Sequence, residues 1–372
     1  MRVAVARETR AHERRVALVP ALVGRLTSLG LDVVIEEGAG LGSFHSDDAY
    51  REAGAKVVDS GSGGGLDEAD VVLSVNPLPA ERMRTLREGT ITLSFLPVGQ
   101  SADIIEAARD AKVSAFSIEL VPRISRAQSM DALTSQAMVA GYRAVLVAAE
   151  RLPRFFPLNM TAAGTVPPAQ VFVLGAGVAG LQAIATARRL GAKVSAYDVR
   201  AAASEEVRSL GATFVELDLP TREGAGGYAR EMTEDRAQLQ RDLLIPHVAD
   251  ADVRITTAAV PGRSAPLLVE TTAIEQMKPG SVVVDLAAES GGNVEGSVAG
   301  SEITVGGATL WGGQNVPSQL SVHASRLYAG NLVAIVTLLT QEGGQVVLDF
   351  EDEIIAAACV THAGEIRVEV PA

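Results

Sequence analysis

The stretch from Val171 to Asp198 constrains the fold more than any other part of this 372-residue chain. An apolar run meets the pattern Gly175-x-Gly177-x-x-Gly180, an alanine-rich helical segment follows, and a second apolar run ends at Asp198. Gly175 permits a tight turn after the strand, Gly177 lets the backbone approach a pyrophosphate, and Gly180 lets the helix pack closely on the sheet. The N–H groups of the first helical turn would receive the phosphate charge. The sequence therefore predicts a strand–helix–strand unit that binds a dinucleotide.

The carboxylate that ends the second run predicts which dinucleotide binds. Asp198 can accept hydrogen bonds from the hydroxyls of the adenosine ribose, and it would repel a 2′-phosphate. The sequence therefore favours NAD(H) over NADP(H). A glycine-rich turn that only packs between strand and helix is the alternative, but it leaves the terminal acid unexplained.

Charge and cysteine content argue against several classes of function. A net charge of −13 makes a nucleic-acid partner unexpected. Cys359 is the only cysteine, and the five histidines show no ligand spacing, so neither a disulfide framework nor a metal site is expected. The N-terminus does not read as a signal peptide, and no uninterrupted apolar run reaches the roughly 18 residues of a membrane span. We therefore expect a cytoplasmic protein without a membrane span of its own.

Two segments in which short β-rich runs alternate with helical patterns predict two α/β domains with parallel sheets. The predicted strands are 2–6, 32–36, 70–75, 90–95 and 113–119, then 171–174, 193–197, 213–216, 253–257, 281–285 and 303–305. The predicted helices are 20–30, 47–53, 80–87, 101–111, about 129–152 as a connector, and about 322–340. The polar, glycine-containing segment 221–240 predicts a long loop of functional importance. We expect two Rossmann-like, doubly wound domains, 1–128 with 320–372 and 129–319, and a nucleotide cleft between them.

Four further motifs are spread over nearly the whole chain. Residues 7–20 read RETRAHERRVALVP, 121–133 read VPRISRAQSMDAL, 162–169 read AAGTVPPA, and 226–232 read GGYAREM. Together they resemble the NAD(H)-binding subunit, or domain I, of proton-translocating nicotinamide nucleotide transhydrogenases, with a wider relation to alanine dehydrogenase. The second motif is the most specific to the transhydrogenases.

The resemblance implies an activity and a set of partners. Hydride would pass directly from NADH on this chain to NADP⁺ on an NADP(H)-binding beta subunit, coupled to proton movement through a membrane subunit. The chain would be peripheral on the inner membrane through these partners. It would form a homodimer, because segment 153–170 exchanges between protomers in the family.

The resemblance also implies the site residues. The dihydronicotinamide would be oriented by Arg123, Gln128, Asp131 and Thr134, where Asp131 can pair with Arg123 and Thr134 replaces the usual serine. The remaining nucleotide contacts would come from Ser129, Met130, Val178, Val199, Arg200, Gly227, Tyr228, Gln240 and Ala259, besides the three glycines and Asp198. Asp198, Val199 and Arg200 would hold the ribose, and Tyr228 would lie at the tip of a loop that closes over the nucleotide.

Other interpretations remain open. Ser129 or Asp131 could simply cap the long helix, and Tyr228 could be a surface aromatic. An amino-acid dehydrogenase of the alanine or saccharopine type is the first alternative function. Its essential lysine and histidine correspond here to Asn76 and Pro97, neither of which can act as an acid or base, although Arg15 remains. A nucleotide sensor without chemistry is the second alternative.

Overall fold

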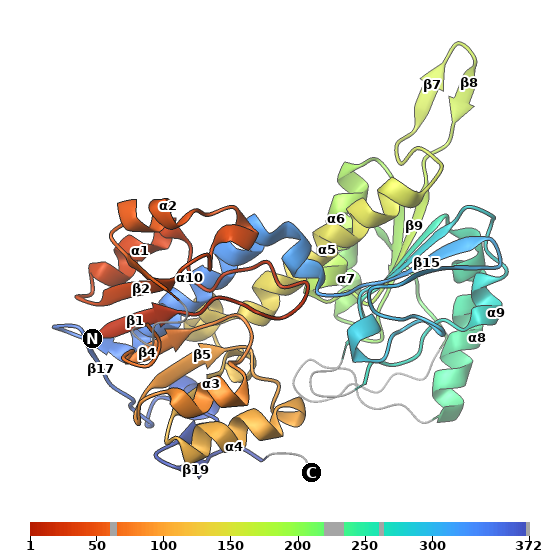
Figure 1. The fold of residues 1–372 in the computed structure, drawn as a ribbon. Coiled ribbons are helices and arrows are strands. Elements are labelled where there is room, and N and C mark those ends of the chain that lie inside the picture. Colours follow the sequence, from red (N-terminus) through yellow and green to blue (C-terminus); the bar gives the residue numbers. More distant parts are fainter. Residues whose placement is uncertain (60–64, 219–233, 260–263, 370–372) are drawn as a thin grey trace. The chain divides into compact units, whose positions relative to one another are not determined.

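The computed structural model describes residues 1–59, 65–218, 234–259 and 264–369 (Figure 1). The chain forms two compact units. Unit 1 comprises Met1–Gln136 together with Pro317–Ala372, and unit 2 comprises Ala137–Val316. The division expected from the sequence, after residues 128 and 319, differs from these bounds by eight and three positions.

Unit 1 is built on a six-stranded sheet with the order β3-β2-β1-β4-β5-β6, in which every pairing is parallel. Its strands are β1 (Arg2–Val5), β2 (Asp32–Glu36), β3 (Lys56–Val58), β4 (Val71–Leu73), β5 (Ile91–Ser94) and β6 (Ser114–Ser117). Its helices are α1 (Pro20–Thr27), α2 (Asp47–Glu52), α3 (Ala80–Thr85), α4 (Ala102–Asp110), α10 (Ser321–Leu339) and α11 (Glu353–Ala358). The chain passes from β1 outward to β3 and then back to β4, so the sheet has a topological switch point between β1 and β4.

The alternation of side chains along β1 shows how the two faces of this sheet are filled. Val3 and Val5 point into a core shared with α1, α2, α10 and α11, whereas Ala4 points into a second core shared with α3 and α4. Figure 1 shows α1, α2 and α10 on one face of the sheet and α3 and α4 on the other. Unit 1 is therefore a three-layer α/β sandwich, as the sequence predicts.

Unit 2 is built on a seven-stranded sheet with the order β11-β10-β9-β12-β13-β15-β14. All pairings are parallel except the edge hairpin of β14 and β15. Its strands are β9 (Gln170–Leu174), β10 (Lys193–Tyr197), β11 (Thr213–Phe214), β12 (Val253–Thr256), β13 (Val282–Asp285), β14 (Glu302–Val305) and β15 (Ala308–Gly312). Its helices are α6 (Val178–Arg189), α7 (Ala203–Ser209), α8 (Glu234–Asp250), α9 (Thr271–Ile274) and most of α5 (Ala132–Arg151).

Two cores flank this sheet, one shared with α5, α6 and α7 and the other shared with α8 and α9 (Figure 1). The first depends on a close helix contact. A Cβ at Gly141 of α5 would lie 2.8 Å from the carbonyl carbon of Ala179 in α6, so only glycine allows this approach. The doubly wound Rossmann-like fold expected from the sequence is thus present in unit 2.

Several elements differ from the sequence interpretation. Strands β3 and β15 and helix α9 were not predicted. The connecting helix begins at Ala132 rather than 129, because residues Ser125–Met130 form a 3-10 helix. The predicted loop over 221–240 is wrong in its last section, where α8 begins at Glu234. The rest of that predicted loop lies outside the described residues.

The proline-bracketed segment before β9 forms a small antiparallel hairpin of β7 (Asn159–Thr161) and β8 (Gly164–Val166). In Figure 1 this hairpin extends away from the sheet of its own unit. Its neighbourhood exposes four large apolar side chains: Phe155 (60%), Leu158 (51%), Met160 (76%) and Val166 (40%). Such a cluster on a projecting hairpin is typical of an interaction surface.

Two helical stretches of the described chain have the length and apolar composition of a membrane span. One is α5, Ala132–Arg151, and the other is Val316–Leu339, which consists of a 3-10 helix (Val316–Leu320) followed by α10. About half of each is buried inside the protein, 44% and 56% respectively. The central helix of a globular core has the same composition, so these two helices are weak evidence for insertion in a membrane.

Candidate functional site

The three glycines of the fingerprint have different structural requirements. Gly175 has a φ of +95°, and a Cβ there would lie 2.7 Å from the Thr257 hydroxyl oxygen. A Cβ at Gly180 would overlap the Gly175 carbonyl group, 2.8 Å from its carbon. A Cβ at Gly177, by contrast, would meet no atom within 4 Å, and its φ of −74° suits any residue. The fold itself therefore requires Gly175 and Gly180, whereas the space above Gly177 suits a phosphate placed on the first turn of α6.

Asp198 follows β10 and is tied into the glycine turn. Its Oδ2 accepts a 2.7 Å hydrogen bond from the Ala176 backbone N–H, and its Oδ1 accepts a 2.8 Å bond from the Arg200 N–H. The Arg200 guanidinium donates to both carboxylate oxygens at 3.1 Å and to the Ala176 carbonyl at 3.2 Å. These bonds fix the acid at the carboxyl end of the sheet. A ribose that hydrogen bonds to Asp198 would replace some of the Arg200 contact.

Small apolar surfaces surround this turn. Val178, at the first position of α6, Val199 and Ala259 are all exposed. Gln240 differs from them, because it is buried in α8 with its side chain next to the Tyr197 hydroxyl, whose pKa is raised to about 12 by burial and by the Asp198 charge. Gly227 and Tyr228 lie outside the described residues.

Two residues that the sequence interpretation did not name hold the neighbouring loops. The Thr257 hydroxyl, after β12, donates to the Gly175 carbonyl at 3.0 Å. The Asn293 side chain donates to the carbonyl groups of Ala258 and Pro266, both at 2.8 Å. Thr257 directly follows β12, and Asn293 holds the loop that continues from the end of the same strand. Neither residue belongs to a sequence motif, so only the strand register reveals them.

In unit 1, the residues proposed to orient the nicotinamide lie where the 3-10 helix Ser125–Met130 meets α5. Arg123, Gln128 and Ser129 are exposed, and Met130 is buried. Asp131 caps α5, since its Oδ1 accepts from the Thr134 N–H at 2.8 Å and its Oδ2 accepts from the Thr134 hydroxyl at 2.7 Å.

This arrangement bears on two details of the sequence interpretation. The capping role considered for Asp131 is confirmed. Both of its oxygens serve Thr134, whereas pairing with Arg123 was the expectation. The Thr134 hydroxyl proton is committed to Asp131, so toward a ligand this hydroxyl can act only as an acceptor.

An asparagine on α10 anchors this segment. The Asn331 amide donates to the Ser129 carbonyl at 2.8 Å, and its oxygen accepts from the Ser135 hydroxyl at 2.7 Å. Arg126, on the same 3-10 helix, makes a bidentate pair with Asp352, with bonds of 2.5 and 3.1 Å. The backbone of the motif is therefore held by residues that follow it by some 200 positions, and neither was foreseen from the sequence.

A charged network lies at the switch point of the unit 1 sheet. Arg15 is almost fully buried, and its guanidinium donates to both oxygens of Glu13, at 2.9 and 2.7 Å, and to the Gln136 side chain at 3.0 Å. The Asn76 amide nitrogen bridges Glu8 and Glu13, at 2.9 and 3.0 Å. Burial raises the pKa of Glu8 to about 7, against the hydrogen bonds from Asn76 and the Val75 N–H.

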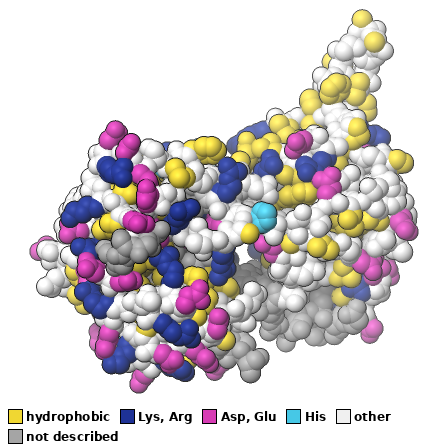
Figure 2. All heavy atoms as spheres, in the orientation of Figure 1, with side chains coloured by type: hydrophobic (Ala, Val, Ile, Leu, Met, Phe, Trp, Pro, Cys, Tyr) yellow, Lys and Arg dark blue, Asp and Glu magenta, His cyan; other side chains and the backbone are white. Residues whose placement is uncertain are grey.

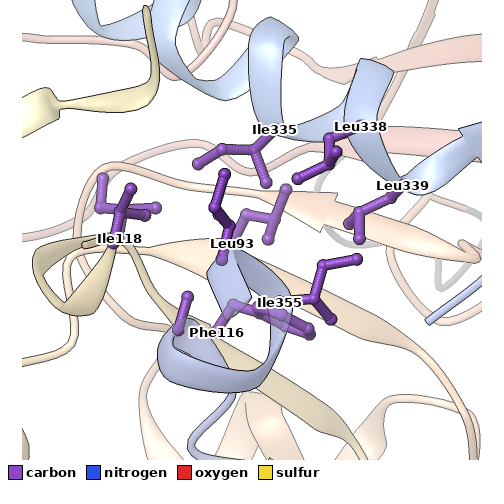
Figure 3. Close-up of a pocket in the computed structure, with 10 residues that line it drawn as sticks. Leu93, Phe116, Ile118, Ile335, Leu338, Leu339 and Ile355 are labelled. Atoms are coloured by element: carbon purple, nitrogen blue, oxygen red, sulfur yellow. The ribbon is translucent and has the colours of Figure 1, made fainter. Parts of the chain in front are cut away.

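A small cavity in unit 1 carries no candidate chemistry. Figure 3 shows that its walls are aliphatic and aromatic carbon from strands β5 and β6 and helices α10 and α11, among them Leu93, Phe116, Ile335 and Ile355. Its volume is about 10 Å³, roughly the space for one water molecule. The described residues also contain no cluster of three metal-ligating side chains. On the face shown in Figure 2, basic and acidic side chains of unit 1 are interspersed.

The fold and the glycine turn together define a two-domain α/β protein of the nicotinamide-dinucleotide-binding class. The chain belongs to the alanine dehydrogenase/PNT family: the N-terminal domain of that family matches residues 4–140, and its C-terminal domain matches residues 144–369. The family resemblance inferred from the four motifs is confirmed.

Three similar proteins illustrate the relationship. The NAD(P) transhydrogenase subunit alpha (first of its parts) of Rhodospirillum rubrum is 44% identical, over 98% of this chain and 97% of the relative. The crystal structure of transhydrogenase from Sinorhizobium meliloti, also 44% identical, superposes with a TM-score of 0.86 and covers 98% of both chains. Alanine dehydrogenase of Mycobacterium tuberculosis is 36% identical over 80% of this chain and 75% of the relative. The transhydrogenase alpha subunits are thus more similar to this chain than this dehydrogenase is.

Proposed function

We propose that this chain is the NAD(H)-binding subunit of a proton-translocating transhydrogenase. It binds NADH and presents it to NADP⁺ held by a partner beta subunit, while a membrane subunit couples the reaction to proton translocation. The relatives named transhydrogenase subunit alpha match along nearly the whole chain, which supports this role. The chain would then lie in the cytoplasm, peripheral to the inner membrane through its partners.

The observation that carries the proposal is the combination of an intact dinucleotide turn with a unit 1 network unsuited to a keto acid. Direct hydride transfer between two nicotinamides needs two aligned rings and the exclusion of water, and it needs no general acid or base. By resemblance, Asn76 and Pro97 correspond to the lysine and histidine of an alanine dehydrogenase. The guanidinium of Arg15 is already occupied by Glu13 and Gln136.

The chain's own residues would bind and orient the reduced nucleotide. Gly177 leaves room for the pyrophosphate, and Asp198 with Arg200 would receive the ribose. Arg123, Gln128, Asp131 and Thr134 would set the plane of the ring that carries the hydride. Gln128 is exposed, which suits a residue that reaches toward a second nucleotide on a partner.

The hairpin of β7 and β8 supports the homodimer that we propose. Its exposed apolar side chains lack cover within the described chain, and exchange of this segment between protomers would bury them. The exposed apolar side chains extend from Phe155 and Leu158, before the hairpin, to Met160 and Val166 on its two strands. A surface that extends over both strands could be covered by a partner protomer.

Reconstitution with the NADP(H)-binding subunit tests the proposal. With NADH deuterated at the transferred position of C4, the label should appear on C4 of NADPH and not in the solvent. Gln128→Asn should lower the transfer rate by about tenfold or more while NADH affinity changes little, because the shortened side chain misplaces one ring. Gln100→Asn, at an exposed position of unit 1, is the matched control and should transfer at the wild-type rate.

The amino-acid dehydrogenase remains the second candidate, and one observation favours it. The pKa of Glu8, raised to about 7 by burial, lies in the range of a general acid or base. Turnover of pyruvate and ammonia with NADH by this chain alone would establish the dehydrogenase and refute the transhydrogenase role. Absence of both this turnover and label transfer would instead indicate a nucleotide sensor.

A further inference from the structure

The sheets of the two units place their strands in equivalent register. In unit 1, β1 pairs with β2 and β4, so that Val5 lies opposite Ile35 and Leu73. In unit 2, β9 pairs with β10 and β12, so that Leu174 lies opposite Tyr197 and Thr256. Position by position, Glu36 therefore corresponds to Asp198, and the turn after β1 corresponds to the glycine turn after β9.

The equivalent acids are also held in the same way. Glu36 Oε2 accepts a 2.7 Å hydrogen bond from the Arg7 backbone N–H, as Asp198 Oδ2 accepts one of 2.7 Å from Ala176. Each acid also makes an ion pair with an arginine, Arg82 for Glu36 and Arg200 for Asp198. The structural position that meets the ribose in the proposed NAD(H) site thus recurs in unit 1.

A hollow of about 510 Å³ opens at this place in unit 1, lined by Arg7, Glu8, Thr9, Glu36 and Arg82. Its chemistry differs from the dinucleotide site in one respect. Glu8 stands at the position of Gly177, so a side chain leaves the backbone at the point where the dinucleotide turn has none. Helix α1 begins only at Pro20, and its N-terminus is therefore too far along the chain to supply the phosphate-binding amides of the motif.

Side chains rather than backbone supply the positive charge of this hollow. Arg82 is neutralised by Glu36, but Arg7 is exposed, and its guanidinium has no hydrogen-bonding partner in the described part of the chain. Glu8 directs its oxygens to the N–H groups of Val75 and Asn76. Arg7 is thus available for a phosphate. Glu36 beside it is buried and bonded to Arg82, so ring hydroxyls would reach its carboxylate by replacing part of the Arg82 contact.

We propose that the hollow formed by Arg7, Thr9, Glu36 and Arg82 binds a phosphorylated ribose, with Arg7 on the phosphate and Glu36 on the ring hydroxyls. The hydroxyl half of this assignment rests on the role proposed for Asp198. The hollow lacks both the glycine and the helix N-terminus that receive a pyrophosphate in a dinucleotide turn. The ligand is therefore a sugar phosphate or a nucleoside monophosphate, bound independently of the NAD(H) site.

Calorimetric titration tests the site on the full chain with its NAD(H) site saturated by NADH. Ribose 5-phosphate should bind saturably, and Arg7→Gln should weaken it by at least about tenfold, the contribution of one charge-assisted hydrogen bond. Arg10→Gln, three positions further along and also exposed, is the matched control and should change the affinity by less than about twofold. AMP that binds with the same dependence on Arg7 would identify a nucleotide as the ligand, and AMP that fails to bind would identify a sugar phosphate.

Two results would overturn the proposal: ribose 5-phosphate binding that is absent or indifferent to Arg7→Gln, or inorganic phosphate binding as tightly as ribose 5-phosphate. The second would mean that the hollow attracts an anion without reading the hydroxyls. NADH affinity, measured on the same variants, should not change with Arg7→Gln. Failure of NADH to bind would therefore count against the proposed function, separately from the fate of this site.

Discussion

Two glycines of one turn should respond in opposite ways to the same added methyl group. At Gly177 the methyl group would meet no atom within 4 Å. The backbone there is compatible with alanine, and a more restricted unfolded chain would stabilise the fold by about 0.4–1 kcal/mol. Alanine is a poorer N-cap than glycine by a similar amount. The two effects nearly cancel, so Gly177→Ala should leave the free energy of unfolding within about 1 kcal/mol of wild type.

At Gly180 the added methyl group would overlap the Gly175 carbonyl group, and it would lie 3.1 Å from the Thr257 hydroxyl oxygen. Both neighbours are held, the carbonyl by the turn and the hydroxyl by its bond to that carbonyl. Relief therefore requires α6 to move away from the sheet. Overpacking of this kind costs about 1–3 kcal/mol or more. For a unit of this size, Gly180→Ala should lower Tm by several degrees.

Nucleotide binding separates the two variants. If the pyrophosphate lies over Gly177, its methyl group blocks the approach, and Gly177→Ala should weaken NADH binding by about a hundredfold or more, roughly 3 kcal/mol. Thermal unfolding followed by circular dichroism gives the stability, and NADH fluorescence gives the affinity. Gly24→Ala, on an exposed face of α1 with no atom near the added methyl group, is the control and should bind NADH normally.

Wild-type NADH affinity in Gly177→Ala would mean that the open space at Gly177 has nothing to do with the ligand, contrary to this prediction. A loss of stability in Gly177→Ala as large as that in Gly180→Ala would equally contradict the prediction.

Three further predictions concern buried titratable groups. Arg254 of β12 is fully buried, and its Nε and Nη2 have no hydrogen-bond partner among the described residues. Burial lowers the pKa of Arg254 to about 9, because the charged form is unfavourable there. Arg254→Met should therefore raise the free energy of unfolding, measured by urea, by about 1–3 kcal/mol even after loss of the stacking on Phe172. The exposed control Arg189→Met should leave it unchanged. The pKa of Glu8 is raised by burial from 4.5 to about 7, so folding takes up a proton there and this contribution to stability is lost as pH rises through that interval. Urea unfolding between pH 4.5 and 8 should show that Glu8→Gln removes this component of the slope, and an unchanged slope would contradict the burial of Glu8. Burial raises the pKa of the Cys359 thiol to about 11, so a thiol reagent at pH 8 should react about a hundredfold more slowly with the folded chain than with the urea-unfolded chain.

Most of the fold could be predicted because its strands are buried on both faces. Runs such as Val71–Leu73 and Val282–Val284 are continuous and apolar, which is typical of a parallel sheet. The elements that were missed lack this signal. Strand β15 alternates buried and half-buried residues between two glycine pairs, so it reads as a turn-rich segment. Helix α8 is polar and contains Pro246, and only its contacts with the sheet explain why it is helical.

The candidate site divides in the same way. The glycine turn and Asp198 could be predicted because each position has a local steric or electrostatic requirement. Thr257, Asn293 and Asn331 could not, since each acts on a segment far away in the sequence through one or two hydrogen bonds. No local pattern marks such residues. Their selection depends on where the strands and helices end in space.

Arg15 belongs to a network in which one arginine lies among two carboxylates, Glu8 and Glu13. By resemblance, position 76 carries a lysine in the alanine dehydrogenases, and a lysine there would lie between the carboxylates of Glu8 and Glu13. Asn76 keeps hydrogen bonds to both acids but brings no charge, so one arginine remains for two buried acids. Glu13, which holds Arg15 through two bonds, retains the ion pair. Burial disfavours the ionised form of Glu8 and raises its pKa to about 7, and the nearby Glu13 charge adds to this rise. Removing either member of the remaining pair would leave a buried charge alone, which is strongly destabilising. Arg15 therefore stabilises this network, with both oxygens of Glu13 and the Gln136 side chain as its partners.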